Sequence, residues 1–188
     1  MFHPILLLLG FWYILPAYVA NGLAIFSKLF RTRHPIDRGR VLRDGHPLLG
    51  AGKTWEGFAI GFVAGASVGI LQYATAPVLL VLIEQYLFLP DQLRPVVLMT
   101  IPQVLLVALG ALLGDVLGAF IKRRLNIPRG RPAPVLDQLA FLSVAILLGI
   151  IANPLPLILV GFLLLATPAI HLLANAIAYL LRLKDVPW

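Results

Sequence analysis

Residues 96–120 read VVLMTIPQVLLVALGALLGDVLGAF, and this stretch decides the fold class. A helix of about 20 mostly apolar residues crosses the roughly 30 Å of hydrocarbon in a bilayer, so the stretch is long enough to span a membrane. Its one charged residue is Asp115. An acid inside a membrane span is costly and normally faces a polar cavity, a partner or an ion. The stretch therefore predicts a membrane-spanning helix that carries a functional carboxylate. The alternative is that Asp115 only forms a structural ion pair with Lys122 or an arginine.

The rest of the chain has the same apolar character. Of its 188 residues, 60% are hydrophobic and 12% are charged, and the mean hydropathy is +0.94. A soluble domain is nearer half apolar and about a quarter charged, so this composition excludes a water-soluble globule, and it also excludes a disordered chain. The chain has no cysteine, which excludes disulfides, thiolate metal sites and cysteine nucleophiles. We expect residues 1–188 to form a single membrane domain.

The apolar segments predict an all-α polytopic membrane protein with five transmembrane helices. The predicted spans are residues 2–26, 55–73, 96–120, 135–152 and 155–181. A further apolar stretch, residues 77–89, is too short to span alone, so it either extends the second helix or lies along the interface. Glycines at every fourth position on two spans predict close helix packing. These glycines are Gly57, Gly61, Gly65 and Gly69 on the second span, and Gly110, Gly114 and Gly118 on the third.

Basic residues predict the orientation of the spans. The loops 28–53 and 122–134 hold twelve of the fifteen lysines and arginines, and Arg182 and Lys184 follow the last span. With five spans all of these lie on one side, and only Arg94 lies on the other. Because basic loops stay in the cytoplasm, the N-terminus is expected outside, and both loops and the C-terminus are expected inside the cell. We expect the partner of these basic loops to be the lipid bilayer and not a nucleic acid. The sequence does not indicate how many copies of the chain associate.

The end of the first loop suits phosphate binding. Residues 50–54 read GAGKT and are followed by an expected helix. The run is not a Walker P-loop, because Pro47 stands where that motif needs its first glycine and no strand precedes it. Two glycines, a lysine and a helix N-terminus still favour an anion. The alternative is that Thr54 and Glu56 only begin a helix.

The second loop is basic and stiff, and acids flank it. It holds five basic residues, three prolines and one glycine, with Asp115 before it and Asp137 after it. Proteins hold Mg²⁺ with one or two carboxylates and leave its other positions to water and phosphate oxygens. The acids and bases therefore predict a site for Mg²⁺, a polyphosphate and a lipid headgroup, and hence phosphoryl or nucleotidyl transfer onto a lipid.

Asn21 lies late in the first span. It either bonds a neighbouring helix or contributes to a polar pocket.

Five motifs together resemble the CDP-archaeol synthase family. They are Asn21-Gly22, Pro35-Ile36-Asp37, LGAGKTWEG at residues 49–57, GDVLGAFIKRR at 114–124 and RGRPAPVLDQL at 129–139. The resemblance covers essentially the whole chain. It implies a Mg²⁺-dependent reaction of CTP with an unsaturated archaetidic acid, an isoprenoid ether-lipid phosphate, which gives the CDP-activated lipid and pyrophosphate. More distant phosphatidate cytidylyltransferases have two acids flanking an arginine where this chain has Asp137-Gln138-Leu139, so another loop is expected to help complete the site.

The resemblance also implies roles for individual residues. The implied catalytic residues are Asp115, Asp137 and Lys122. The implied metal ligands are Asp115 and Asp137, with Asp37 and Glu56 as supplements. The implied CTP- and phosphate-binding residues are Gly50, Gly52, Lys53, Thr54, Glu56, Lys122, Arg123 and Arg131. Further pocket residues are Asn21, Asp37, Gly118 and Pro134.

The main alternative is a small transporter or channel for an anionic solute, which would also need polar groups in the membrane. Against it, the expected outer loop offers only Glu84, Asp91 and Arg94 as charged groups, and no inverted repeat is evident. The aspartate motifs of a CDP-alcohol phosphatidyltransferase or a prenyltransferase are not found in the sequence. A non-catalytic anchoring subunit would leave the intramembrane Asp115 unexplained.

Overall fold

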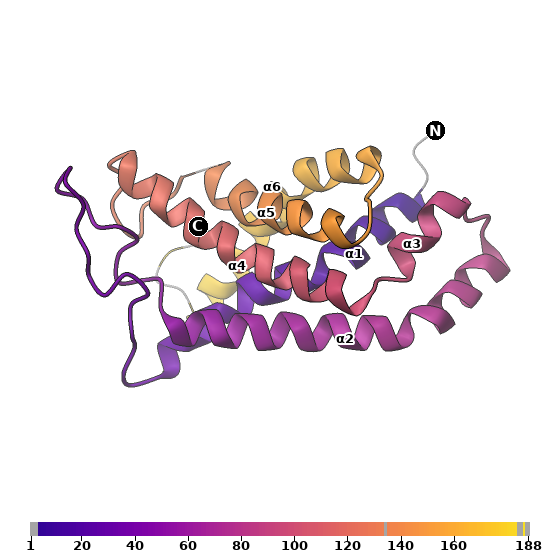
Figure 1. Ribbon diagram of the computed structural model, residues 1–188, viewed down its shortest axis with the longest axis horizontal. Coiled ribbons are helices and arrows are strands. Elements are labelled where there is room, and N and C mark those ends of the chain that lie inside the picture. Colours follow the sequence, from indigo (N-terminus) through magenta and orange to yellow (C-terminus); the bar gives the residue numbers. More distant parts are fainter. Residues whose placement is uncertain (1–3, 134, 184–185, 187–188) are drawn as a thin grey trace.

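All regular elements in the computed structural model are helices. The structure describes residues 4–133, 135–183 and 186, apart from the side chain of His171, and in these residues it contains two isolated β-bridges but no strand. The elements are α1 (Pro4–Leu23), η1 (Ala24–Leu29), α2 (Trp55–Tyr86), η2 (Asp91–Leu93), α3 (Arg94–Val97), α4 (Ile101–Arg124), α5 (Leu136–Ala152) and α6 (Leu157–Leu180). Figure 1 shows the long helices running back and forth between the two ends of the molecule. The predicted all-helical class is confirmed.

The described helices are those of a polytopic membrane protein. Four segments are long and apolar enough to cross a membrane, namely Ile5–Leu29, α2, α4 and α6, and α5 is a shorter apolar helix of 17 residues. The stretch 77–89 extends the second helix, because α2 continues through Pro77 to Tyr86. The predicted third span begins five residues late, at Ile101, because Thr100 and Gln103 form a capping box there and residues 94–97 belong to α3.

The glycine series brings helix backbones into contact, as predicted. A Cβ atom added to Gly61 of α2 would lie 2.5 Å from the Ala20 carbonyl oxygen of α1. A Cβ atom added to Gly114 of α4 would lie 2.6 Å from the Cα of Phe141 in α5. No side chain fits at such distances, so only glycine permits this approach. The close α4–α5 contact matters most for the site described below.

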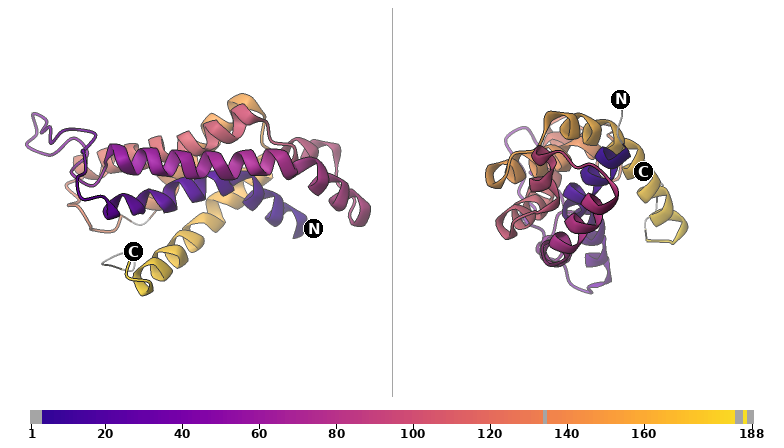
Figure 2. Two further views of the ribbon diagram at one scale, coloured as in Figure 1. Left: turned by 90° about the horizontal axis from the view of Figure 1, so that it is seen from below. Right: turned by 90° about the vertical axis from the view of Figure 1, so that its right-hand side faces the viewer.

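One end of the bundle gathers the polar segments. The core lies where α1 meets α4 and α5 and includes the fully buried Tyr13, Val107 and Leu142. Helix α6 leaves the other helices at an angle (Figure 2), and a hydrogen bond of 2.7 Å between the hydroxyls of Tyr18 and Thr167 ties it to α1. One end of the bundle holds the long first loop, residues 30–54 (Figure 1). The start of α2, the end of α4 and the start of α5 lie at the same end.

Candidate active site

A cavity of about 220 Å³ opens between the first loop, the end of α4 and the start of α5. The charged residues among the described residues that line it are Lys53, Asp115, Lys122, Arg123, Arg129 and Asp137. Four are basic and two are acidic, so their formal charge is +2. The cavity therefore favours an anionic ligand while offering two carboxylates to a cation.

The contact between α4 and α5 places the two carboxylates on this cavity. Asp115 follows Gly114, whose Cα faces the backbone of α5, and a Cβ atom added to Gly118 one turn later would lie 3.0 Å from the Ala140 Cβ. Asp137 belongs to the first turn of α5. Because no side chains separate these parts of the two helices, acids from both helices reach the same space.

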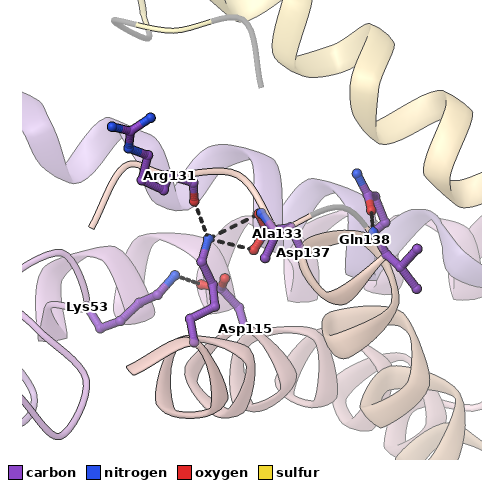
Figure 3. Close-up of polar contacts among 8 residues, drawn as sticks. Lys53, Asp115, Arg131, Ala133, Asp137 and Gln138 are labelled. Carbon is purple, nitrogen blue, oxygen red and sulfur yellow. Dashed lines mark hydrogen bonds and ion pairs between the residues drawn. The ribbon is translucent and has the colours of Figure 1, made fainter. Parts of the chain in front are cut away.

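Asp137 is held by several contacts. The Nζ atom of Lys122 donates to both carboxylate oxygens of Asp137, at 2.9 and 3.1 Å, and to the carbonyl oxygen of Arg131 at 2.8 Å. The backbone N–H of Ala133 donates to Asp137 Oδ2 at 2.9 Å (Figure 3). Lys122 and Asp137 thus fix the second loop against the start of α5.

Asp115 is held by one contact that crosses the cavity. The Nζ atom of Lys53 lies 2.5 Å from Asp115 Oδ2, and Figure 3 shows the two side chains pointing toward each other. The side chains are 27% and 35% exposed, so water reaches both. This ion pair joins the first loop to α4.

Asp37 organises the first loop from inside. Its Oδ1 accepts from the N–H of Gly39 at 3.0 Å, and its Oδ2 accepts from the N–H groups of Leu49 at 2.9 Å and Gly50 at 2.8 Å. Burial raises the pKa of Asp37, but these amide donors lower it more, so the pKa lies below its usual range and the group stays ionised. Gly50 has a φ of +92°, in the left-handed region that favours glycine. The Gly50 amide is therefore committed to Asp37.

Thr54 and Glu56 lie at the start of helix α2. The buried Thr54 is the N-cap, and its hydroxyl accepts from the N–H of Gly57 at 3.2 Å. Glu56 accepts from the backbone N–H of His34 at 3.0 Å, and its Oε1 lies 2.5 Å from the ring Nδ1 of the same histidine. Neither residue lines the cavity, and neither does Asp37.

The predicted four-acid metal set is therefore not brought together. In the part of the chain that the structure describes, no group of three or more His, Cys, Asp or Glu side chains could hold a metal ion. Asp115 and Asp137 line one cavity. The carboxylate of Asp37 instead accepts from backbone amides of its own loop, and that of Glu56 accepts from His34. Two carboxylates that line one cavity match the donor set with which proteins hold Mg²⁺, whose other positions go to water and phosphate oxygens.

Comparisons with known proteins give the family. A family model described as CarS-like CDP-archaeol synthase matches residues 2–188. The chain belongs to the CDP-archaeol synthase family. The CDP-archaeol synthase of Pyrococcus horikoshii is 44% identical over 182 residues, which cover 97% of each chain. That of Pyrobaculum arsenaticum is 43% identical over 175 residues, which cover 93% of this chain and 94% of the relative.

A solved structure agrees with this membership. The structure, described as "Structural insight into an intramembrane enzyme for archaeal membrane lipids biosynthesis", is similar with a TM-score of 0.66 at 37% identity, and the match covers 88% of this chain and 91% of the other. The predicted resemblance is confirmed. As a CDP-archaeol synthase family member, the chain is a cytidylyltransferase of archaeal membrane lipid synthesis, which favours the enzyme over the transporter.

Two arginines of the second loop differ in their position relative to the cavity. Arg131, which the resemblance implies as a phosphate-binding residue, does not line the cavity, and its side chain points away from Asp115 and Asp137 in Figure 3. Arg129, which the sequence did not single out, lines the cavity and lies over Gly52, where an added Cβ would be 3.2 Å from its Nε. Both are arginines in one stiff loop, so only the loop conformation distinguishes them.

The remaining expected site residues divide between the cavity and its surroundings. Gly52, Gly118 and Arg123 line the cavity, and the Nε of Arg123 is buried with no hydrogen-bond partner among the described residues. Asn21 is half-buried in the last turn of α1 and does not line the cavity. Pro134 lies outside the described residues.

Arg124 attaches the tip of the first loop to α4. Its guanidinium donates to the Asp44 carboxylate and to the carbonyl oxygens of Pro47, at 2.5 Å, and His46, at 3.4 Å. It also lies over the Phe120 ring, 5.3 Å from the centroid. The pKa of Asp44 lies below its usual range, mainly because the backbone N–H of His46 donates to it and also because the Arg124 guanidinium is close. Arg124 therefore holds the loop over the cavity instead of lining it.

Proposed function

We propose that this chain transfers the cytidylyl group of CTP to the phosphate of an unsaturated archaetidic acid, a digeranylgeranylglyceryl phosphate, and releases pyrophosphate. The observation that carries the proposal is the cavity, in which two acids and four bases meet at one end of a bundle of apolar helices. Membership in the CDP-archaeol synthase family supports the same reaction. The isoprenoid chains would remain in the bilayer while the phosphate reaches the cavity.

The reaction needs no protein nucleophile. An oxygen of the lipid phosphate forms a bond to the α-phosphorus of CTP, the bond from that phosphorus to the α–β bridging oxygen breaks, and pyrophosphate leaves with the electron pair. Such transfers depend on positioning and on neutralising the charge of the phosphates. Lys53, Lys122, Arg123 and Arg129 would supply the positive charge, and holding both substrates together lowers the barrier further.

Magnesium is the proposed cofactor, with Asp115 and Asp137 as its protein ligands. Bound there, it would neutralise negative charge on the phosphate oxygens. The two carboxylates and the neighbouring bases match what Mg²⁺ and a triphosphate need together. Asp37 and Glu56 would then act on the loop conformation and not on the metal.

The proposed topology has five spans, α5 included, with the N-terminus outside and the cavity on the cytoplasmic side. Positive charge supports it, because both basic loops lie at the cavity end of the bundle. Because the chain has no cysteine, single introduced cysteines test it cleanly. Arg43→Cys should react with a membrane-impermeant thiol reagent only from the cytoplasmic side and Phe88→Cys only from outside; the reverse pattern, or one shared side, contradicts the topology.

Label transfer tests the reaction itself. Protein reconstituted in vesicles is given the unsaturated ether-lipid phosphate, Mg²⁺ and CTP labelled either at the α- or at the γ-phosphate. We expect the α-label to enter the organic-extractable lipid and the γ-label to leave as pyrophosphate, with both lost on chelation of the metal. Parallel assays with ATP, GTP and UTP, and with saturated or ester-linked lipid phosphates, define the substrates. Failure of the α-label to reach lipid, together with flux of an anionic solute, would support the transporter instead.

A further inference from the structure

The two lysine–aspartate pairs of the cavity differ in how firmly they are held. Lys122 donates to three acceptors, and Asp137 also accepts from the backbone of Ala133. Among the described residues, the side chains of Lys53 and Asp115 have polar contacts only with each other. The Lys53–Asp115 pair can therefore separate without breaking another hydrogen bond of the site.

Lys53 is also able to move to a different acceptor. Its ammonium stands on a flexible four-carbon stem and carries three donors, so it can reach another oxygen without a backbone shift. Lys53 and Asp115 are partly exposed, and both line the cavity that would receive the phosphates. Lys53 thus has two acceptors within its reach at different stages, the Asp115 carboxylate and a phosphate of the ligand.

The charge of the cavity opposes a metal ion that enters alone. The lining residues carry a formal charge of +2, and Asp115 is already neutralised by Lys53. A divalent cation would be repelled by this surplus, whereas a triphosphate would be attracted. Once phosphates are present, Lys53 can neutralise them and leave Asp115 to the metal.

We propose that Lys53 and Asp115 form an exchangeable counter-ion pair that makes metal and nucleotide binding depend on each other. Without ligand, Lys53 occupies the carboxylate that would hold the metal, and Asp115 occupies the ammonium that would hold a phosphate. When the metal–nucleotide complex binds, the Lys53–Asp115 contact is replaced by two others, Lys53 with a phosphate and Asp115 with the metal. The inference rests on the proposed function, since it takes a nucleoside triphosphate and a divalent cation as ligands.

Direct measurement of metal binding tests the exchange without turnover. Mn²⁺ is titrated into the purified full-length chain and followed by electron paramagnetic resonance, with and without CTP and in the absence of lipid substrate; Mn²⁺ bound by free CTP is measured separately. We expect CTP to raise the Mn²⁺ affinity of the protein by about fivefold or more, and Mn²⁺ to raise the CTP affinity by the same factor.

Substitution of Lys53 separates competition from a structural role. Lys53→Met keeps the aliphatic stem but removes the competing charge, so nucleotide-free protein should bind Mn²⁺ about fivefold tighter than the wild type, and the gain from CTP should shrink. Asp115→Asn frees Lys53, so CTP in excess chelator should bind tighter than to the wild type. Lys28→Ala, which removes a charge outside the cavity, is the matched control and should change neither affinity.

The exchange is overturned if nucleotide-free wild type binds Mn²⁺ as tightly as the CTP complex does, or if Lys53→Met binds Mn²⁺ no tighter than the wild type. It is also overturned if Asp115→Asn weakens metal-free CTP binding while its unfolding temperature stays at the wild-type value. The wild-type preparation is assayed for label transfer in parallel. Transfer without the Mn²⁺ effects rejects the exchange alone, whereas absence of transfer rejects the proposed function.

Discussion

The two halves of the cavity are held together by different forces. In the α4–α5 half, backbones touch at Gly114, and Asp137 accepts three hydrogen bonds, two from Lys122 and one from the backbone of Ala133. In the loop half, residues 30–54 have no regular helix and are held by polar contacts through Asp37 and Arg124. Close packing of the backbones makes the first half the more rigid one. The second half is a loop held by polar contacts, of which the Lys53 and Arg124 pairs are partly exposed, so it is the more adjustable one.

This difference indicates a division of labour. A rigid pair of helices is suited to hold a metal at a fixed position, because helix packing fixes the backbone positions of both ligands. A loop held by polar contacts is suited to rearrange around phosphates. The contrast predicts that changes in the α4–α5 half affect turnover or folding, and that changes in the loop half affect nucleotide affinity.

The largest effect is expected from the two carboxylates. Asp115→Asn and Asp137→Asn should each lower kcat by about 10²- to 10³-fold, because charge stabilisation of the reacting phosphates is lost. Asp137→Asn should also lower stability by about 1 kcal/mol, since asparagine has one acceptor oxygen where Asp137 uses two. Single-turnover label transfer and thermal unfolding measure both quantities. Full activity of either variant would contradict its assignment as a metal ligand.

The next effect distinguishes two arginines of the second loop. Arg129→Ala should raise the KM for CTP and weaken inhibition by pyrophosphate about tenfold or more, because a charge-assisted hydrogen bond contributes about 1.5–3 kcal/mol. Arg131→Ala is the matched comparison, since only the Arg131 backbone carbonyl contacts the site, through Lys122. A larger KM effect at Arg131 than at Arg129 would show that the loop rearranges when nucleotide binds.

The sequence predicted the rigid half better than the loop half. Helix positions follow from apolar length and glycine spacing, so Asp115, Asp137 and Lys122 were predicted to lie near each other, and they line one cavity. The loop conformation depends on contacts between residues far apart in sequence. Asp37 accepts a hydrogen bond from the N–H of Gly50, thirteen residues later, which no local sequence pattern indicates. From the sequence alone, a carboxylate that binds a metal cannot be distinguished from one that binds a backbone amide.

Close packing of α4 on α5 is tested by adding one methyl group. Gly114→Ala places a Cβ against the backbone of Phe141, so stability should fall by about 1–3 kcal/mol and activity should fall as Asp137 moves away from Asp115. Gly161→Ala on α6 is the control, because an added Cβ there meets no atom within 4 Å. Thermal unfolding in the same detergent compares the two. Equal stability of both variants would mean that α4 and α5 tolerate separation.

The smallest effect is expected from the attachment of the loop tip. Arg124→Ala and Asp44→Asn should each raise the KM for CTP a few-fold with kcat unchanged, because a partly exposed ion pair contributes about 0.2–1 kcal/mol. Arg124→Ala should be the larger change, since Arg124 also contacts Pro47 and the Phe120 ring. Added salt screens this ion pair, so it should raise the KM of the wild type for CTP toward that of the variants.

A double-mutant cycle of Arg124 and Asp44 then decides whether the loop tip acts through this pair. If the two changes are coupled, the double variant resembles Arg124→Ala alone, because Asp44 has lost its partner in both. Strict additivity would mean that Arg124 acts through the carbonyls of His46 and Pro47. A fall in kcat without a change in KM would place the loop tip with the rigid half of the cavity, and the division of labour would then be wrong.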